Sequence, residues 1–174
     1  LCVFFLAVLS QGGLWLALAM LCFTVMVALT FYLLSDEAVR KDVVDDTGKA
    51  ALGFLYIGLP LCLLVLIRRA PRGNEWIFFL LTVIFLGDTG AFYCGRLLGR
   101  HKLYVSVSPG KTWEGAVGGF MSSVAGGIFF SQVFSLHDDL WIIGGLSAGL
   151  SIAGQVGDLV ESMIKRNYGV KDSG

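Results

Sequence analysis

The C-terminal part of the chain carries a group of polar side chains three or four residues apart, a spacing that places them on one face of an α-helix. The group consists of Asp158, Glu161, Ser162 and Lys165. Snorkelling at a membrane interface accounts for Lys165 and the neighbouring Arg166. It does not account for Asp158, because Gly154 and Gly157 leave little bulk around that carboxylate. Oxygen ligands suit a hard cation such as Mg²⁺, so we predict Asp158 and Glu161 as metal ligands.

A second carboxylate, Asp88, lies about twelve residues into an apolar run that starts at Trp76. Charged groups inside such runs are expensive in a bilayer and indicate function. Arg96 follows eight residues later on nearly the same helical face. One interpretation is a buried structural pair, of Asp88 with either Arg96 or Thr89. The alternative is that Asp88 and Arg96 line a polar pocket that opens to the cytoplasm.

The polar loop at 106–115 contains Gly110-Lys111-Thr112. A phosphate-binding P-loop is excluded, because Val105 stands where its leading glycine belongs and the flanking segments are apolar helices. Ser108, Lys111 and Thr112 nevertheless precede a helix N-terminus, where donors and the helix dipole favour anions. The loop is therefore either an anion cradle or a plain helix cap.

Composition places these residues in a membrane protein. The 174 residues are 56% hydrophobic and only 15% charged, against about 45–50% and 25% in soluble domains. Thirteen basic and thirteen acidic residues give zero net charge, which removes the electrostatic case for a nucleic-acid partner. The four cysteines stand singly in or beside apolar runs, so we predict neither a zinc site nor a disulfide framework.

The apolar runs predict an all-α polytopic bundle, because about 20 apolar residues span the hydrocarbon core. We expect about five full spans after an N-terminal helix remnant at 1–9, and a kink at Pro60 in the second span. The expected spans are 14–34, 50–67, 76–95, 113–134 and 141–163. We divide the chain into N-terminal spans at 1–75 and a catalytic-type region at 76–174. Since it begins within an apolar run, we expect a fragment.

The basic residues predict the orientation. Ten of the thirteen lie in the loops 35–49, 96–112 and 164–174, which alternate spans place on one side. The positive-inside rule makes that side cytoplasmic. Small residues also recur every fourth position in the last two spans, which indicates close helix packing. They are Gly115, Gly119, Ser123 and Gly127, then Gly145, Gly149, Ala153 and Gly157.

No Ser/His/Asp or Cys/His grouping supports covalent catalysis. Carboxylates and basic residues beside glycines at a cytoplasmic membrane face suit metal-assisted phosphoryl or nucleotidyl transfer instead.

Four ordered motifs between residues 76 and 174 resemble the phosphatidate cytidylyltransferase (CDP-diacylglycerol synthase) family. Gly87-Asp88-Thr89-Gly90-Ala91-Phe92 is similar to the family's G-D-x-x-A-Y motif, and 108–115 to its S-P-x-K-T-x-E-G loop. The segment 157–162 provides the third motif. The tail 162–174 resembles the first half of a signature that continues in the family with H-G-G and D-R-x-D.

The resemblance implies transfer of a cytidylyl group from CTP to phosphatidic acid within the bilayer, with Mg²⁺ or another divalent cation as cofactor. It implies that Asp158 holds the metal with an acid of the D-R-x-D segment. It assigns catalytic roles to Asp158, Lys165, Arg166 and Asp172, and substrate binding to Asp88, Arg96, Ser108, Lys111, Thr112 and Lys171.

It also implies a bacterial inner-membrane location and a homodimer. The sequence given does not contain the H-G-G and D-R-x-D residues. If it is the whole polypeptide, we expect no turnover; if it is a fragment of a longer protein, we expect that parent to be active. Two alternatives stay open: a CTP-dependent lipid kinase of the polyprenol or phytol type, and a non-enzymatic membrane transporter or scaffold.

Overall fold

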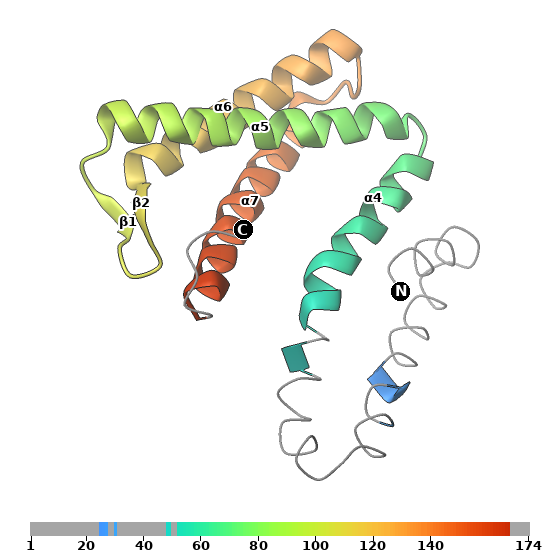
Figure 1. Ribbon diagram of the computed structural model, residues 1–174. Coiled ribbons are helices and arrows are strands. Elements are labelled where there is room, and N and C mark those ends of the chain that lie inside the picture. Colours follow the sequence, from blue (N-terminus) through green and yellow to red (C-terminus); the bar gives the residue numbers. More distant parts are fainter. Residues whose placement is uncertain (1–24, 28–29, 31–47, 50–51, 168–174) are drawn as a thin grey trace. The chain divides into compact units, whose positions relative to one another are not determined.

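A computed structural model describes residues 25–27, 30, 48–49 and 52–167 (Figure 1). The chain divides into two compact units, Leu1–Gly73 and Asn74–Gly174, which are described separately. The predicted remnant at 1–9 and most of the predicted span at 14–34 lie outside the described residues.

In the first unit, the region of the second predicted span is helical. A π-helical segment, η1 (Phe54–Gly58), leads into helix α4 (Leu59–Arg69). Pro60 stands in the first turn of α4, where a missing backbone N–H leaves no helical hydrogen bond unmade. The expected kink site is thus the point at which π-helix changes to α-helix.

The second unit contains three helices that are long and apolar enough to cross a membrane. They are α5 (Gly73–Leu98), α6 (Trp113–Phe134) and α7 (Leu140–Asn167). Their bounds contain the three spans predicted for this region, and those of α6 coincide with the prediction. Large side chains such as Phe85, Phe129 and Trp141 are exposed, as lipid-facing residues are. The chain is a multi-pass helical membrane protein.

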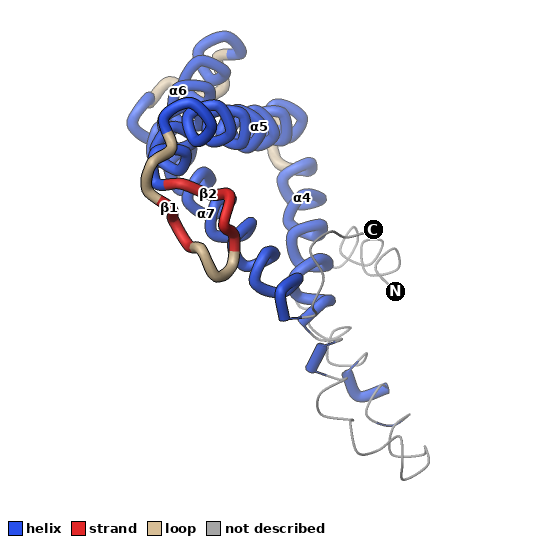
Figure 2. Tube along the Cα trace, turned by 60° about the vertical axis from the view of Figure 1, so that its left-hand side comes forward, coloured by secondary structure: helices blue, strands red, loops and turns tan. Residues whose placement is uncertain are grey.

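The polar loop after α5 folds into a feature that the all-α prediction did not include. Strand β1 (Lys102–Tyr104) pairs antiparallel with β2 (Ser108–Thr112). Lys102 lies opposite Thr112, whereas Tyr104 lies opposite Ser108, so the register shifts between the two pairs. Figures 1 and 2 show this hairpin at the end of the unit where α5 ends and α6 begins.

Polar side chains fix the ends of the helices. The Thr112 hydroxyl accepts a hydrogen bond from the backbone N–H of Gly115 at 3.1 Å and caps the start of α6. Helix α6 ends at Ser135, which adopts the left-handed conformation with φ 48°. The Asp139 carboxylate then accepts from the backbone N–H of Trp141 at 2.8 Å and caps α7.

Helices α5 and α6 approach each other closely along the small residues of α6. A Cβ atom added at Gly119 would lie 2.8 Å from the Gly87 carbonyl oxygen and 2.9 Å from the Ala91 Cβ. The Ser123 hydroxyl donates to the Val83 carbonyl oxygen at 2.8 Å. The first predicted set of small residues is therefore confirmed as a helix-packing face.

The second predicted set is different. A Cβ atom added at Gly145, Gly149 or Gly157 would meet nothing within 4 Å in the described part of the chain. Helix α7 instead buries the face that carries Ile143, Ser147 and Ser151. The prediction that this glycine set packs helices is wrong within this unit, and a homodimer through such faces stays a prediction.

The buried apolar core lies at the end of the unit away from the hairpin. It consists of Phe79 and Val83 in the first half of α5, Leu136 in the turn, and Ile143 at the start of α7. The Trp76 ring packs edge-on against Phe79 with ring centroids 5.6 Å apart. Among the described residues, the hairpin end has no such cluster of buried apolar side chains.

The α5–α6 contact predicts a large difference between two glycine substitutions. Gly119→Ala should destabilise the protein by about 1–3 kcal/mol, because the added methyl group forces the two backbones apart. Gly149→Ala is the matched control, since its methyl group meets open space. It should leave stability unchanged or raise it by up to about 1 kcal/mol through helix propensity. Thermal unfolding in detergent measures both, and equal effects would contradict the packing role.

Candidate active site

A cavity of about 710 Å³ opens within the second unit at the hairpin end. Its walls come from the second half of α5, the hairpin, the start of α6 and the second half of α7. Six of the predicted site residues line it: Asp88, Arg96, Lys111, Thr112, Asp158 and Glu161. The fold thus brings three of the four motifs, those at 87–92, 108–115 and 157–162, to one place.

An ion pair joins the hairpin to α7 inside this cavity. The Lys111 ammonium lies 2.5 Å from the Asp158 carboxylate, and the two side chains are 26% and 59% exposed. Because both groups are only partly shielded from solvent, the pair contributes modestly to stability. The main effect of this ion pair is on position, because it holds a cation and an anion side by side at the cavity wall.

Asp88 and Arg96 line the same cavity from α5. The Arg96 guanidinium lies over the Phe92 ring at 5.9 Å from its centroid, a cation–π contact. Among the described residues, no ion pair links Asp88 to Arg96. The pocket alternative for these two residues therefore agrees with the geometry better than the structural pair.

The last turns of α7 contribute a second ion pair. The Lys165 ammonium lies 2.6 Å from the Glu161 carboxylate, one helical turn away. The Arg166 Nε donates to the Val107 carbonyl oxygen at 3.4 Å, which ties α7 to the hairpin turn. Of the other predicted site residues, Ser108 begins β2 and does not line the cavity. Lys171 and Asp172 lie outside the described residues.

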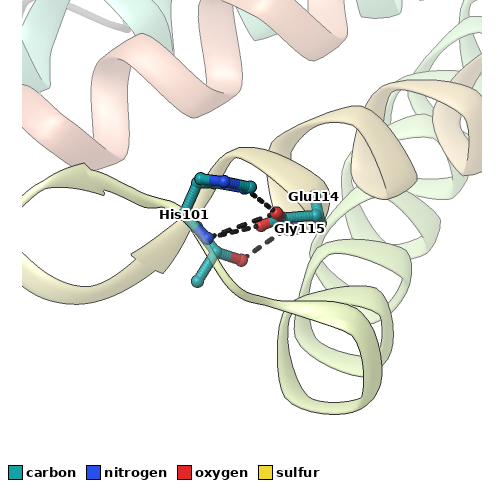
Figure 3. Close-up of polar contacts among 4 residues, drawn as sticks. His101, Glu114 and Gly115 are labelled. Carbon is teal, nitrogen blue, oxygen red and sulfur yellow. Dashed lines mark hydrogen bonds and ion pairs between the residues drawn. The ribbon is translucent and has the colours of Figure 1, made fainter.

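The base of the hairpin is anchored to the start of α6. The Glu114 carboxylate lies 2.6 Å from His101 Nδ1 and accepts from the His101 backbone N–H at 3.2 Å (Figure 3). The Trp113 backbone N–H donates to the His101 carbonyl oxygen at 3.0 Å. Two donors at the α6 N-terminus, those of Trp113 and Gly115, are thus already engaged. Lys111 is accordingly the main positive group that this loop offers an anion.

The donor chemistry of the cavity fits a magnesium ion shared with a phosphate ligand. Mg²⁺ usually takes one or two protein carboxylates and completes its shell with water and phosphate oxygens. Asp88 and Asp158 line the cavity, as does Glu161. Within the described ranges, no three His, Cys, Asp or Glu side chains form a ready metal-binding group. The protein thus offers a partial ligand set, and the metal roles of Asp158 and Glu161 stay predictions.

Sequence reasoning missed Gln155, Phe92 as a cavity residue, and Leu103. The signal for Gln155 was its position, one helical turn before Asp158 on the same face of α7. Leu103 could be placed only once the hairpin was known.

Three long apolar helices and a hairpin around a cavity with charges of both signs define a membrane protein built to hold charged ligands. The chain belongs to the Cytidylyltransferase family, whose model matches residues 1–174. This confirms the family resemblance that the motifs predicted.

Curated proteins named phosphatidate cytidylyltransferase are similar to this chain. Those of Staphylococcus saprophyticus, Staphylococcus epidermidis and Staphylococcus aureus are 38%, 35% and 33% identical to it over 151 residues. The match covers 86% of this chain, which spans 57% of the length of these relatives.

The His101–Glu114 contact predicts how the hairpin responds to mutation. Glu114→Ala removes both the partner of the His101 ring and the acceptor for its backbone N–H. We expect amide hydrogen exchange across residues 102–111 to quicken by about tenfold, because charge-assisted hydrogen bonds of this kind are among the stronger ones.

Asp138→Ala is the matched control, since this carboxylate lies in the turn between α6 and α7, at the other end of the unit. It should leave hairpin exchange unchanged. Equal exchange in the wild type and Glu114→Ala would show that the anchor does not hold the hairpin.

Proposed function

We propose that the chain forms catalytic machinery of a phosphatidate cytidylyltransferase, which converts CTP and phosphatidic acid into CDP-diacylglycerol and pyrophosphate. The observation that carries the proposal is the convergence of Asp88, Lys111 and Asp158 on one cavity at the end of membrane-spanning helices. Membership of the Cytidylyltransferase family supports the reaction class. The names of the similar Staphylococcus proteins support the lipid substrate.

In the proposed reaction, a phosphate oxygen of phosphatidic acid attacks the α-phosphorus of CTP. The bond from that phosphorus to the oxygen bridging to the β-phosphorus breaks, and pyrophosphate leaves with the bridging oxygen. Both substrates are anions and repel each other. The Lys111 ammonium and the Arg96 guanidinium supply positive charge at the cavity wall, which lets the two phosphate groups approach.

The remaining lining divides by polarity. Ile84, Ala91, Phe92 and Leu103 are apolar and suit the part of a lipid nearest its head group. We propose that Lys165 and Arg166, in the last turn of α7, complete the phosphate pocket together with Lys171 and Asp172.

We propose a divalent cation, Mg²⁺ above all, as the cofactor, held by Asp158 with Asp88 or Glu161 and by nucleotide phosphates. When bound, it would neutralise triphosphate charge and stabilise the departing pyrophosphate. The chain's own carboxylates would hold their positions through their lysine partners until the ligands arrive.

Two other functions are distinguished by products and by binding. A CTP-dependent lipid kinase would transfer the γ-phosphoryl group and release CDP. A transporter or scaffold would show no CTP-dependent change at the hairpin. The family match favours nucleotidyl transfer over both.

The proposed function predicts pyrophosphate and CDP-diacylglycerol when the full-length protein, in detergent or nanodiscs, receives CTP, Mg²⁺ and phosphatidic acid. Asp158→Asn should lower turnover by about a hundredfold or more, because it removes a carboxylate charge at the reaction centre. Chromatography of the lipid product and a pyrophosphate assay measure both. Asp138→Asn serves as the control and should retain full activity.

Release of CDP without pyrophosphate would replace the proposal with a kinase. Full turnover by a folded Asp158→Asn variant would overturn the role of Asp158. Protection of residues 96–112 from hydrogen exchange by CTP should accompany activity, and its absence together with inactivity would favour a carrier.

We further propose that the cavity faces the cytoplasm of a bacterial inner membrane, because the hairpin loop belongs to the side that carries ten of the thirteen basic residues. A cysteine introduced at the exposed hairpin turn, Ser106→Cys in a cysteine-free background, should react with a membrane-impermeant thiol reagent in inverted vesicles. In right-side-out vesicles it should not react. The reverse pattern would place the cavity on the outer side.

A further inference from the structure

The packed face of α7 ends in a polar residue. Ile143, Ser147 and Ser151 are buried at intervals of four residues. Gln155 continues the series and is partly buried. Its Nε2 donates to the Ala116 carbonyl oxygen at 3.1 Å and lies 3.4 Å from the Ser151 hydroxyl. The Gln155 amide therefore joins α7 to the backbone of α6.

This hydrogen bond links the two segments that carry the cavity ion pair. Ala116 lies in the first turn of α6, directly after the hairpin strand that ends with Lys111 and Thr112. Asp158 lies three residues after Gln155, on the same side of α7. A slide of α7 along α6 would move Asp158 away from Lys111, and the Gln155 amide opposes that slide.

The described contacts that hold this half of α7 to α6 and the hairpin are mainly polar, and they include the Arg166–Val107 hydrogen bond. A Cβ atom added at Gly154 or Gly157 would meet nothing within 4 Å in the described part of the chain. The buried core lies at the other end of the unit. Hydrogen bonds between helices contribute to helix packing in membranes. The Gln155 amide provides such a bond between α7 and the α6 backbone beside the Lys111–Asp158 pair, while Arg166 contacts the hairpin turn further along α7.

We propose that Gln155 is a positioning residue that sets the distance between Asp158 on α7 and Lys111 on the hairpin, and thereby the geometry of the reaction centre. The claim that Gln155 sets the Lys111–Asp158 distance stands on the contacts of Gln155 alone. The claim that this distance matters for catalysis rests on the proposed function.

The first test measures geometry without activity. In the full-length protein with its native cysteines replaced by alanine, Lys111→Cys and Asp158→Cys are joined by a short bifunctional thiol reagent. Adding Gln155→Met, which keeps an unbranched side chain but removes the donor, should slow cross-linking by about three- to tenfold, as expected for the loss of one interhelical hydrogen bond. Gln155→Leu provides a second variant should Gln155→Met not fold.

Ser123→Ala is the matched control, because it also removes an interhelical hydrogen bond, that from the Ser123 hydroxyl to Val83. It should lower the unfolding temperature and leave the cross-linking rate unchanged. An unchanged rate in a folded Gln155 variant would overturn the proposal.

The second test is kinetic. With Lys111 and Asp158 intact, Gln155→Met should lower kcat by about tenfold or more and leave the KM for CTP nearly unchanged, since supporting residues around a reaction centre have effects of this size. In the Asp158→Asn background the same change should have no further effect. A raised KM with unchanged kcat would overturn the proposal, because it would make Gln155 a direct nucleotide contact.

The two tests separate the two failures. If no form of the protein transfers a cytidylyl group, the proposed function fails, while the cross-linking rates still decide whether Gln155 sets the spacing. If the wild type is active and Gln155→Met keeps full kcat, the positioning role fails and the proposed function stands.

Discussion

The structure of the second unit depends on the approach of two helix backbones with almost no side chain between them. In a bilayer, helices gain nothing by hiding apolar groups from lipid, so their association rests on close packing and on hydrogen bonds. Gly119 meets the Gly87 carbonyl, and Gly115 meets the Ala91 carbonyl and the Gly95 Cα atom. Because α5 and α6 are held backbone to backbone, the hairpin that joins them has a fixed base.

The cavity follows from an uneven distribution of packing. At one end, Phe79, Val83, Leu136 and Ile143 fill the space between the helices. At the other end, α7 carries glycines at which an added Cβ atom would meet nothing within 4 Å in the described part of the chain, and polar side chains line much of the space. Hydrogen bonds and ion pairs replace apolar packing there, through Gln155, Lys111 and Arg166. A site for charged ligands at a membrane surface needs this change from apolar to polar contacts along one helix.

Much of this arrangement could be predicted from the sequence, for identifiable reasons. Helix positions were predictable because apolar length reports directly on membrane spans, and α6 begins and ends where expected. The convergence of Asp88, Lys111 and Asp158 was implied by the family resemblance of their motifs, whereas the rarity of charges only singled out each residue. The hairpin was not predicted, although Leu103, Val105 and Val107 stand at every second position. The run is short, and the base of the hairpin is held by the His101–Glu114 contact between residues thirteen apart. The prediction that the α7 glycines pack against another helix of this unit failed for a related reason. Periodic spacing shows that residues share one face of a helix, but it does not show which element covers that face.

The pairing of Lys111 with Asp158 has a thermodynamic consequence for ligand choice. Lys111 already has a counterion of its own, so an anion that enters by itself must compete with a carboxylate fixed to the protein. If the anion succeeds, the Asp158 carboxylate loses that partner, and because its side chain is 59% exposed, water offsets part of the loss. A ligand that brings its own positive charge would satisfy both members of the pair at once. On the proposed function, the pair would therefore favour an anion that enters together with a cation.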